Sequence, residues 1–230
     1  MKKQVCKSQL CAEFLGSMFL VMASISSMIL LVEVLEAPKS IAVFGNAIAV
    51  AFVLCALIEV FGPISGSHFN PVVTMVMALE KKISALNASM FVLFQFLGGI
   101  AGVALSRLMF LNEVGSLLSV SDNIRNDYVF FSEIFGTFIL MLAILLLVKA
   151  RSSKISIIVG LLVGGQLIST SSTMFANPQV TVARMFTDTA SGIRPIDGFI
   201  FIAMQTVGAL LAYMVYKFAF TKKTYEAGER

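Results

Sequence analysis

The sequence contains one histidine, three cysteines and no tryptophan among its 230 residues. Because His68 is the single histidine, a histidine-based metal cluster is excluded. Cys6, Cys11 and Cys55 form no CxxC pair, which argues against a zinc site and against a disulfide framework. Enzyme catalysis needs a nucleophile with a base, or a metal. No apolar segment of this sequence holds a cluster of His, Asp and Glu residues that could serve in this way. We therefore expect no catalytic residues, no metal and no cofactor.

Charged residues are also scarce. They make up 13% of the chain, and hydrophobic residues make up 58%, with a mean hydropathy of +0.92. Soluble domains carry about a quarter charged residues, so this composition indicates a membrane protein. The net charge of +4 comes from basic residues in short loops beside apolar segments, a pattern that does not indicate a nucleic-acid partner. No hydrophilic stretch is long enough to fold separately, so residues 1–230 are predicted to form one domain in the lipid bilayer.

Six apolar segments are long enough to cross a bilayer, which takes about 20 residues. They are residues 10–32, 41–61, 84–110, 128–149, 155–173 and 196–219. The first is expected to be a retained span, because Glu13 lies near its start and no small-residue cleavage site follows it. Two further apolar stretches begin at Asn70 and Asn177 and last only about ten residues, which is typical of re-entrant half-helices. The predicted fold class is an all-α membrane protein with six transmembrane helices and two re-entrant half-helices.

The basic residues predict the orientation. With six spans, both termini lie on one side of the membrane. Basic residues on that side are Lys2, Lys3, Lys7, Lys81, Lys82, Lys149, Arg151, Lys154, Lys217, Lys222, Lys223 and Arg230. The opposite side has only Lys39, Arg125 and Arg194, while Arg107 and Arg184 fall within apolar segments. Since cytoplasmic loops carry the excess of Lys and Arg, both termini are predicted to be cytoplasmic.

An internal repeat predicts how the two halves are arranged. The repeated motifs are Glu13-Phe-Leu-Gly16 with Glu133-Ile-Phe-Gly136, Asn70-Pro-Val-Val-Thr74 with Asn177-Pro-Gln-Val-Thr181, and Gln95-Phe-Leu-Gly-Gly99 with Gln205-Thr-Val-Gly-Ala209. The first repeat covers residues 8–110 and the second covers residues 127–219. Each half holds three spans, an odd number, so the second half enters the membrane inverted. The two Asn-Pro segments therefore approach the midplane from opposite faces.

The Asn-Pro pairs are typical of helix starts. Pro71 and Pro178 fit the first turn of a helix, and Asn70 and Asn177 before them are favourable N-caps. A helix N-terminus carries roughly half a positive charge. Two such ends at the midplane would repel protons and metal cations, while the Asn side chains could still donate hydrogen bonds to a neutral hydroxylic solute. The alternative is that both pairs are ordinary caps of loop-to-helix junctions.

Two carboxylates and two amides inside apolar spans need partners. A carboxylate in a span is costly unless it is paired. Glu13 and Glu133 are predicted to accept hydrogen bonds from the non-helical backbone of the re-entrant loops, which lipid cannot satisfy. The alternative places them near helix ends, facing the headgroups. Gln95 and Gln205 are expected to give the same structural support.

These motifs resemble those of the aquaporin, or major intrinsic protein, superfamily. Ser65-Gly-Ser-His-Phe-Asn-Pro-Val-Val-Thr74 is similar to its first signature, Phe175-Ala-Asn-Pro-Gln-Val-Thr181 to its second, and Ala12-Glu-Phe-Leu-Gly16 to the start of its first helix. The resemblance covers residues 8–219. It implies an aquaporin-like fold of six tilted helices and two half-helices, a pore in each subunit, and a homotetramer.

The sequence departs from the family pattern in both motifs. The usual third motif residue is Ala, which is replaced here by Val72 and Gln179. Gln179 is larger and polar, so it could narrow the midplane or add a hydrogen-bond partner. The family usually places an Arg in the outer filter three residues after the second Asn, and that position here is Val180.

Ungapped counting from the two Asn residues predicts the other walls of the filter. The predicted filter residues are Val50, Gly165, Met174 and Val180. Such a constriction would be apolar and wide. Glycerol-conducting members resemble this chain in having glycine at the position of Gly165. The resemblance therefore favours a bacterial aquaglyceroporin-like member in the inner (plasma) membrane, with polyols or undissociated metalloid hydroxides as solutes.

Arg184 and His68 each have two interpretations. Arg184 lies four residues beyond Val180, so it could carry positive charge into the outer vestibule and partly replace the missing filter Arg. It could instead pair with Asp188 at i+4 or extend to the outer interface. His68 could line the inner mouth and respond to pH, or it could be a loop residue hydrogen-bonded to backbone.

Two classes of transport protein fit this pattern. The first is a passive channel for water and small uncharged solutes such as glycerol-like polyols. The second is an ion-coupled secondary transporter, because inverted repeats with broken helices also form such proteins. Coupling needs a titratable or ion-binding group near the midplane, and the candidates Glu13, Glu59 and Glu133 all lie towards span ends. The channel is therefore the favoured prediction.

Overall fold

The computed structural model describes residues 5–125 and 127–221, and the predicted all-helical fold is confirmed. Five of the basic residues that predict the orientation lie outside the described residues: Lys2, Lys3, Lys222, Lys223 and Arg230. In the described part, five helices are long and apolar enough to span a membrane. They are α1 (Lys7–Met28) with η1 (Ile29–Val34), α2 (Lys39–Ser65), α4 (Ala85–Met109), α6 (Asp127–Lys149), and α9 (Pro195–Val215) with η2 (Tyr216–Phe220).

The sixth predicted span is shorter than expected. The helix α7 (Ile155–Ser169) has 15 residues, which is about 22 Å at 1.5 Å per residue. Residues 170–173 were predicted to be helical, but Thr170 has an extended backbone, with φ −111° and ψ 147°. The run of Ser and Thr at 169–173 explains this ending, because short hydroxyl side chains compete for backbone groups. Thr170 Oγ1 and Ser172 Oγ, for example, both accept a hydrogen bond from Met174 N, at 3.0 and 3.1 Å.

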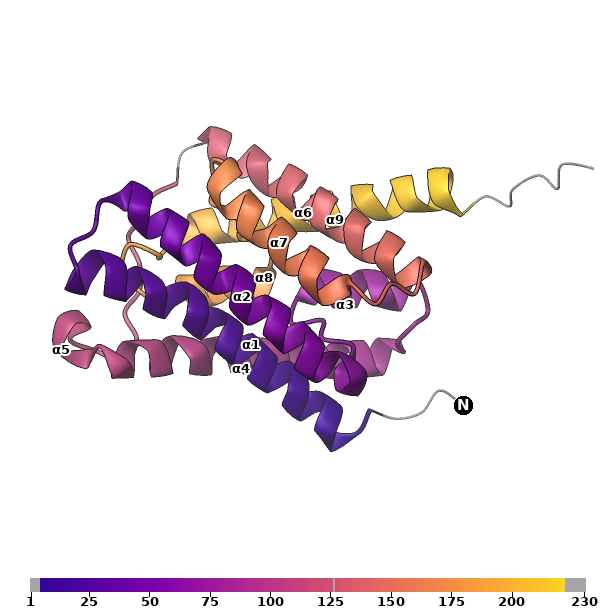
Figure 1. Cartoon of the computed structure of the whole chain (residues 1–230), viewed down its shortest axis with the longest axis horizontal. Helices are drawn as coiled ribbons and strands as arrows, with labels where there is room; N and C mark the ends of the chain where they lie inside the picture. The colour runs from indigo at the N-terminus through magenta and orange to yellow at the C-terminus, as the bar shows by residue number, and fades with distance from the viewer. Residues whose placement is uncertain (1–4, 126, 222–230) are drawn as a thin grey trace, which may run out of the picture.

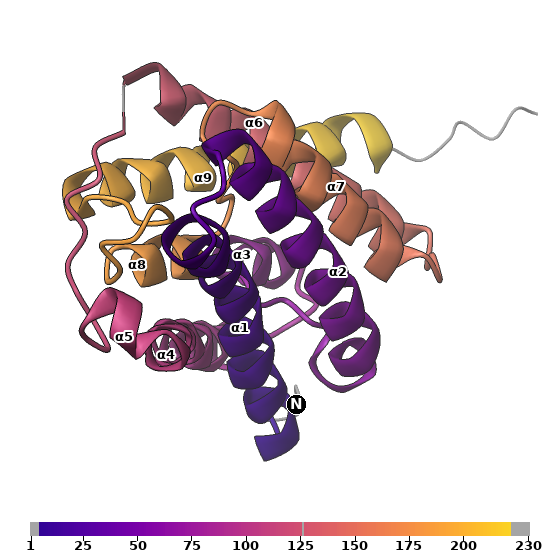
Figure 2. The same ribbon diagram turned by 60° about the vertical axis from the view of Figure 1, so that its left-hand side comes forward.

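The long helices surround two short ones. In Figures 1 and 2, α1 packs against α4 and α2, α6 packs against α9 and α7, and α2 crosses to α7. The half-helices α3 (Pro71–Leu79) and α8 (Pro178–Arg184) lie in the interior, between α4 and α9. They begin close together and run towards opposite ends of the molecule (Figure 1). A short helix α5 (Leu111–Val114) follows α4.

The loops gather at two opposite ends (Figure 1). At one end, Val5 N donates to Asn87 Oδ1 at 3.2 Å, and Lys217 forms an ion pair with Glu80 at 3.0 Å. At the other end, Arg194 N donates to the carbonyl oxygen of Asn123 at 2.8 Å. The loops predicted to face the cytoplasm therefore share the end where α1 begins and η2 ends.

Glycines allow the first and third spans of each half to approach closely. Gly98 of α4 lies against α1, because a Cβ atom at this position would be 2.2 Å from the carbonyl oxygen of Phe14. Gly208 of α9 lies against α6 in the same way, because a Cβ atom at this position would be 2.4 Å from the carbonyl oxygen of Ile134. Real Cβ atoms do not approach backbone oxygens this closely, so only glycine permits these crossings.

The variant Gly208→Ala is expected to lower the thermal unfolding temperature of the purified protein in detergent. The added methyl group would overlap the backbone of α6, and overpacking typically costs about 1–3 kcal/mol. Gly165→Ala is the matched control, because nothing lies within 4 Å of a Cβ atom there. Alanine favours a helix over glycine by about 1 kcal/mol, so the control should unfold at the same temperature or higher. Equal destabilisation by both changes would contradict the close contact of α6 and α9.

Candidate functional site

Asn70 caps the start of α3 and reaches the opposite loop. Its backbone is extended, with φ −155° and ψ 120°, and its Oδ1 accepts a hydrogen bond from Val72 N at 3.0 Å. Its Nδ2 donates to the carbonyl oxygen of Ala176 at 2.8 Å. Pro71, at the first helical position, has no N–H that needs a partner.

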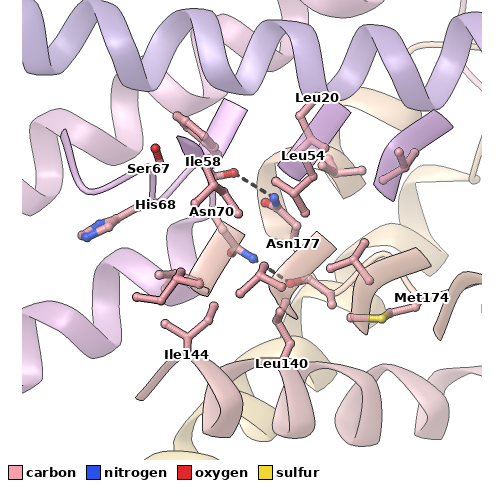
Figure 3. Close-up of a pocket in the computed structure, with 18 of the residues that line it drawn as sticks. Leu20, Leu54, Ile58, Ser67, His68, Asn70, Leu140, Ile144, Met174 and Asn177 are labelled. Carbon is pink, nitrogen blue, oxygen red and sulfur yellow. Dashed lines mark hydrogen bonds between the residues drawn. The ribbon is translucent and has the colours of Figure 1, made fainter. Parts of the chain in front are cut away.

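Asn177 repeats this arrangement from the other side. Its Oδ1 accepts from Gln179 N at 3.1 Å, and its Nδ2 donates to the carbonyl oxygen of Phe69 at 2.8 Å. Figure 3 shows the two Asn side chains side by side, each bonded to the opposite loop. Each amide nitrogen carries two hydrogens and donates one of them in these bonds. A second N–H of each Asn therefore remains for a molecule in the cavity that both residues line.

The loops before the half-helices have a strained backbone. Phe69 and Ala176 both have φ of 46°, in the left-handed region that non-glycine residues seldom adopt. This conformation directs their carbonyl oxygens towards the Asn residues of the opposite loops. Buried carboxylates hold their N–H groups in place.

Glu13 of α1 supports the first loop. Its carboxylate is fully buried and accepts hydrogen bonds from Phe69 N at 2.8 Å and His68 N at 3.0 Å. It also accepts from Ser65 Oγ at 2.6 Å and from Gln95 Nε2 at 2.7 Å. Glu13 therefore faces the loop and not the headgroups.

Glu133 of α6 supports the second loop in the same way. It is fully buried and accepts from Phe175 N at 3.0 Å, Ala176 N at 2.8 Å and Gln205 Nε2 at 2.7 Å. An ionised carboxylate has about four acceptor sites, so each Glu can accept all of these hydrogen bonds. The repeated Glu and Gln of the sequence are thus brought together in both halves.

Two threonines complete these networks and received no role in the sequence analysis. Gln95 Nε2 donates to Thr74 Oγ1, and Gln205 Nε2 donates to Thr181 Oγ1, both at 2.9 Å. Each Thr hydroxyl in turn donates to the carbonyl oxygen of the motif Asn, at 3.1 and 2.9 Å. The signal was present in the sequence, because both threonines end the repeated Asn-Pro motif.

A cavity of about 300 Å³ passes between the two Asn residues. It is lined at one end by Lys82 and Ser67 and at the other by Ser24 and Met174. Its wall is mostly aliphatic: Leu20, Val50, Leu54, Ile58, Val73, Leu140, Ile144, Val159, Val163, Leu167 and Val180. None of the described side chains lining it is a carboxylate. Most of these aliphatic residues could not be identified from the sequence, because any residue of an apolar span can face either lipid or the cavity.

Three of the four predicted filter residues, Val50, Met174 and Val180, line this cavity, but Gly165 does not. Gly165 is exposed, and a Cβ atom there would contact nothing within 4 Å. Val163 and Leu167 line the cavity instead. Residues two apart on a helix point about 200° apart, so Gly165 faces away. The prediction from ungapped counting was wrong at this position.

Gln179 also points away from the cavity. It is buried against α4, where a Cβ atom at Gly99 would lie 2.4 Å from its Oε1. Its Nε2 donates to the carbonyl oxygen of Phe69 at 3.3 Å. Gln179 is absent from the described residues that line the cavity. The idea that it narrows the midplane directly is therefore wrong, and its contact is with the loop backbone.

Arg184 lies at the outer end of the cavity. Its Nη2 donates to Ser24 Oγ, and its guanidinium lies 4.1 Å from the ring centre of Phe175. Both Ser24 and Phe175 line the cavity. Arg184 is buried, so it does not extend to the outer interface.

Asp188, the alternative partner of Arg184, pairs with Arg107 instead. Their side chains form an ion pair of 2.5 Å, and Arg107 also donates to the carbonyl oxygens of Val114 and Ser116 at 2.8 and 2.7 Å. Burial alone would raise the pKa of Asp188, but the hydrogen bond and charge of Arg107 hold this pKa below its usual value. Arg107 was not identified as a structural residue from the sequence, although an Arg within an apolar span is a signal of such a role.

His68 lines the inner part of the cavity. Its Nδ1 is 3.1 Å from Thr74 Oγ1, and its ring packs edge-on against Phe91 at 5.5 Å. Figure 3 shows the ring turned away from Asn70 and Asn177. The side chain is therefore fixed on the wall of the cavity rather than beside the two amides.

Comparisons with known proteins agree with this fold. The family model described as Major intrinsic protein matches residues 1–176. The X-ray structure of the aquaglyceroporin from Plasmodium falciparum superposes with a TM-score of 0.72 and 20% identity, covering 93% of this chain and 96% of that one. The fold is therefore that of an aquaporin-type integral membrane protein with several apolar helical spans.

Sequence relatives lead to the same family. Aquaglyceroporin AqpS of Rhizobium meliloti (strain 1021) is 37% identical over 202 residues, covering 87% of this chain and 85% of the relative. Nodulin-26 of Glycine max is 29% identical over 214 residues, covering 90% and 76%. The chain belongs to the major intrinsic protein family of channels. It is a channel protein of the aquaglyceroporin-like kind and not an enzyme.

Proposed function

We propose that the cavity is a passive pore for water and small uncharged solutes, in particular glycerol-like polyols and undissociated metalloid hydroxides. The observation that carries this proposal is the lining, which combines an aliphatic wall with two amide donors, from Asn70 and Asn177. A solute with hydroxyl groups can accept these hydrogen bonds while its carbon skeleton contacts the aliphatic wall. The relative from Rhizobium meliloti and the solved structure are both named aquaglyceroporins, which supports the same class of solute.

Exclusion of ions follows from the same geometry. The N-termini of α3 and α8 meet at the two Asn residues, and each brings roughly half a positive charge. Cations entering an aliphatic cavity lose hydration and receive no carboxylate from its described lining. A neutral solute is not repelled by the positive helix ends, and it loses much less hydration free energy than a cation does.

An ion-coupled transporter is the second candidate, and the carboxylates argue against it. Coupling needs a carboxylate that can bind and release an ion, but Glu13 and Glu133 are occupied by loop hydrogen bonds. Glu59 accepts from Ser156 Oγ at 2.7 Å. None of the three lines the cavity.

Solute specificity can be tested in proteoliposomes by stopped-flow light scattering with water, glycerol and arsenite at neutral pH, where arsenite is the undissociated hydroxide. We expect glycerol and arsenite to enter faster than into protein-free vesicles. Faster water movement with glycerol and arsenite at the background rate would restrict the pore to water and overturn the wide-filter proposal.

The variant Val180→Arg is expected to reduce glycerol permeability relative to water permeability about tenfold, a barrier change of about 1.4 kcal/mol. Val180, Val50 and Met174 all line the cavity, and we propose that they form its outer apolar ring. A guanidinium there would narrow the ring, while water is small and can accept its hydrogen bonds. Permeabilities are compared within one vesicle preparation, with Arg184→Ala as the companion variant. If Val180→Arg leaves the ratio unchanged and Arg184→Ala raises it, Arg184 is the filter residue instead.

We further propose that residues 8–110 and 127–219 are inverted repeats, that the chain forms a homotetramer with a pore in each subunit, and that both termini are cytoplasmic in a bacterial inner membrane. Exposed aromatic side chains such as Phe52, Phe135 and Phe199 offer surface for lipid or for a second copy. Light scattering of the detergent complex measures the subunit number.

The orientation gives a separate prediction. In a chain without native cysteines, a cysteine at Lys82 is expected to react with an impermeant maleimide only from the cytoplasmic side, and one at Lys39 only from outside. The physical reason is that α3 enters and does not cross, so both of its flanking loops stay on one side. Labelling of the Lys82 position from outside would contradict the re-entrant arrangement.

A further inference from the structure

A second cavity, of about 320 Å³, lies at the outer end of the molecule. Its lining includes three basic side chains, Lys39, Arg125 and Arg184, with the polar residues Asn123, Thr173 and Ser191. None of the described side chains that line it is acidic. The cavity is therefore a concave site with several positive charges.

The two arginines are held on one aromatic ring. The guanidinium of Arg184 lies 4.1 Å and that of Arg125 lies 5.5 Å from the ring centre of Phe175. Arg125 Nη2 donates to the carbonyl oxygen of Gly192 at 3.2 Å, a neutral acceptor. Two like charges on one ring repel each other. The charge of the nearby Glu133 carboxylate acts on both arginines, but its hydrogen bonds come from the second loop and from Gln205.

Part of the donor capacity of both arginines is unused. The Nε atoms of Arg125 and Arg184 are buried and have no hydrogen-bond acceptor among the described residues. The nearby carboxylate of Asp197 is occupied, because it accepts from Arg125 N at 2.9 Å and pairs with the side chain of Arg194 at 2.8 Å. Buried donors without acceptors are costly, and a bound oxyanion would supply acceptors.

This site lies in series with the pore. Arg184 lines the outer cavity and bonds to Ser24, which lines the pore. Thr173 lines the outer cavity, and its neighbour Met174 lines the pore. A molecule held at the arginines would therefore stand at the outer mouth of the pore.

We propose that this outer cavity binds a small oxyanion, a carboxylate or a phosphate-like group, between Arg125, Arg184 and Lys39. Guanidinium groups match the planar or tetrahedral oxygens of such anions and bind them with charge-assisted hydrogen bonds. The bound anion partly closes the outer mouth to neutral solutes. This effect on flux rests on the proposed function, whereas the binding itself does not.

The binding is tested by isothermal titration of the purified full chain with inorganic phosphate and with acetate, at constant ionic strength set by sodium chloride. We expect saturable binding to the wild type, and affinity about tenfold weaker in Lys39→Gln and in Arg125→Gln, a loss of one charge-assisted contact in each. Lys154→Gln, an exposed basic residue outside this cavity, is the matched control and should bind as the wild type does. Lys39 is at the start of α2 near the surface, so its variant reports on binding even if Arg125→Gln folds poorly.

Heat of binding that does not saturate, or equal affinity in the wild type and both cavity variants, would overturn the proposal. Glycerol flux in vesicles provides the second readout. Phosphate should slow this flux in the wild type and not in Lys39→Gln. Binding without slower flux would retain the anion site and reject the partial closure, and absent flux in all samples would reject the proposed function alone.

Discussion

Glu133→Gln is expected to abolish solute flux and to destabilise the protein by about 3 kcal/mol, the order seen when one partner of a buried charged network is removed. The carboxylate accepts three hydrogen bonds, from Phe175 N, Ala176 N and Gln205 Nε2. An amide has a single acceptor oxygen, and its NH2 group would face backbone N–H groups, so at least one buried donor loses its partner at about 1–3 kcal/mol. Without the carboxylate, the left-handed backbone conformation of Ala176 loses a hydrogen bond that stabilises it.

The measurement is thermal unfolding in detergent followed by glycerol flux in proteoliposomes. Glu113→Gln is the control, because Glu113 is exposed on α5 and outside both networks. It should change neither quantity. A Glu133→Gln protein that unfolds and conducts like the control would show that the loop is held by other contacts.

Asn177→Asp is expected to make the pore permeable to cations and to lower its glycerol permeability. An ionised carboxylate cannot donate to the carbonyl oxygen of Phe69, which now accepts from Asn177 Nδ2 at 2.8 Å. It also places a negative charge where the N-termini of α3 and α8 otherwise present positive ends. We expect potassium conductance at least about tenfold above that of the wild type, which corresponds to about 1.4 kcal/mol of barrier.

Conductance is recorded in planar bilayers with protein that elutes as a single folded species in size-exclusion chromatography. The matched control is Asn112→Asp, which makes the same chemical change at an exposed position of α5. Folded Asn177→Asp protein with the conductance of the control would mean that Asn177 is not at the barrier to ions.

The helical fold could be predicted from the sequence because it depends on the lengths of the apolar segments and on the order of the repeated motifs. The lengths of the apolar runs gave the spans, and the recurrence of Asn-Pro gave the two half-helices. The hydrogen bonds of Glu13 and Glu133 to the loop backbones, expected from the cost of a carboxylate in a span, are present in the structure. Each of these features follows from the local chemistry of a residue and its repeat.

Features that depend on side-chain direction could not be predicted in this way. Counting from Asn177 selected Gly165 as a filter residue, but Gly165 is exposed and Leu167 of the same helix lines the cavity instead. Gln179, the third residue of its motif, was expected at the midplane, yet it packs against Gly99 of α4. Arg184 was placed near the vestibule, but its bond to Ser24 joins residues 160 positions apart. Such contacts are decided by tertiary packing rather than by spacing in the sequence.

The cavity between Asn70 and Asn177 is proposed to be a passive pore for neutral solutes. The most direct test measures glycerol flux into proteoliposomes across a wide range of gradients, with and without proton and sodium gradients, while membrane current is recorded. A passive pore predicts flux proportional to the glycerol gradient, unchanged by either ion gradient and accompanied by no current. Saturating flux that depends on a proton or sodium gradient would contradict the claim and assign the chain to the ion-coupled alternative.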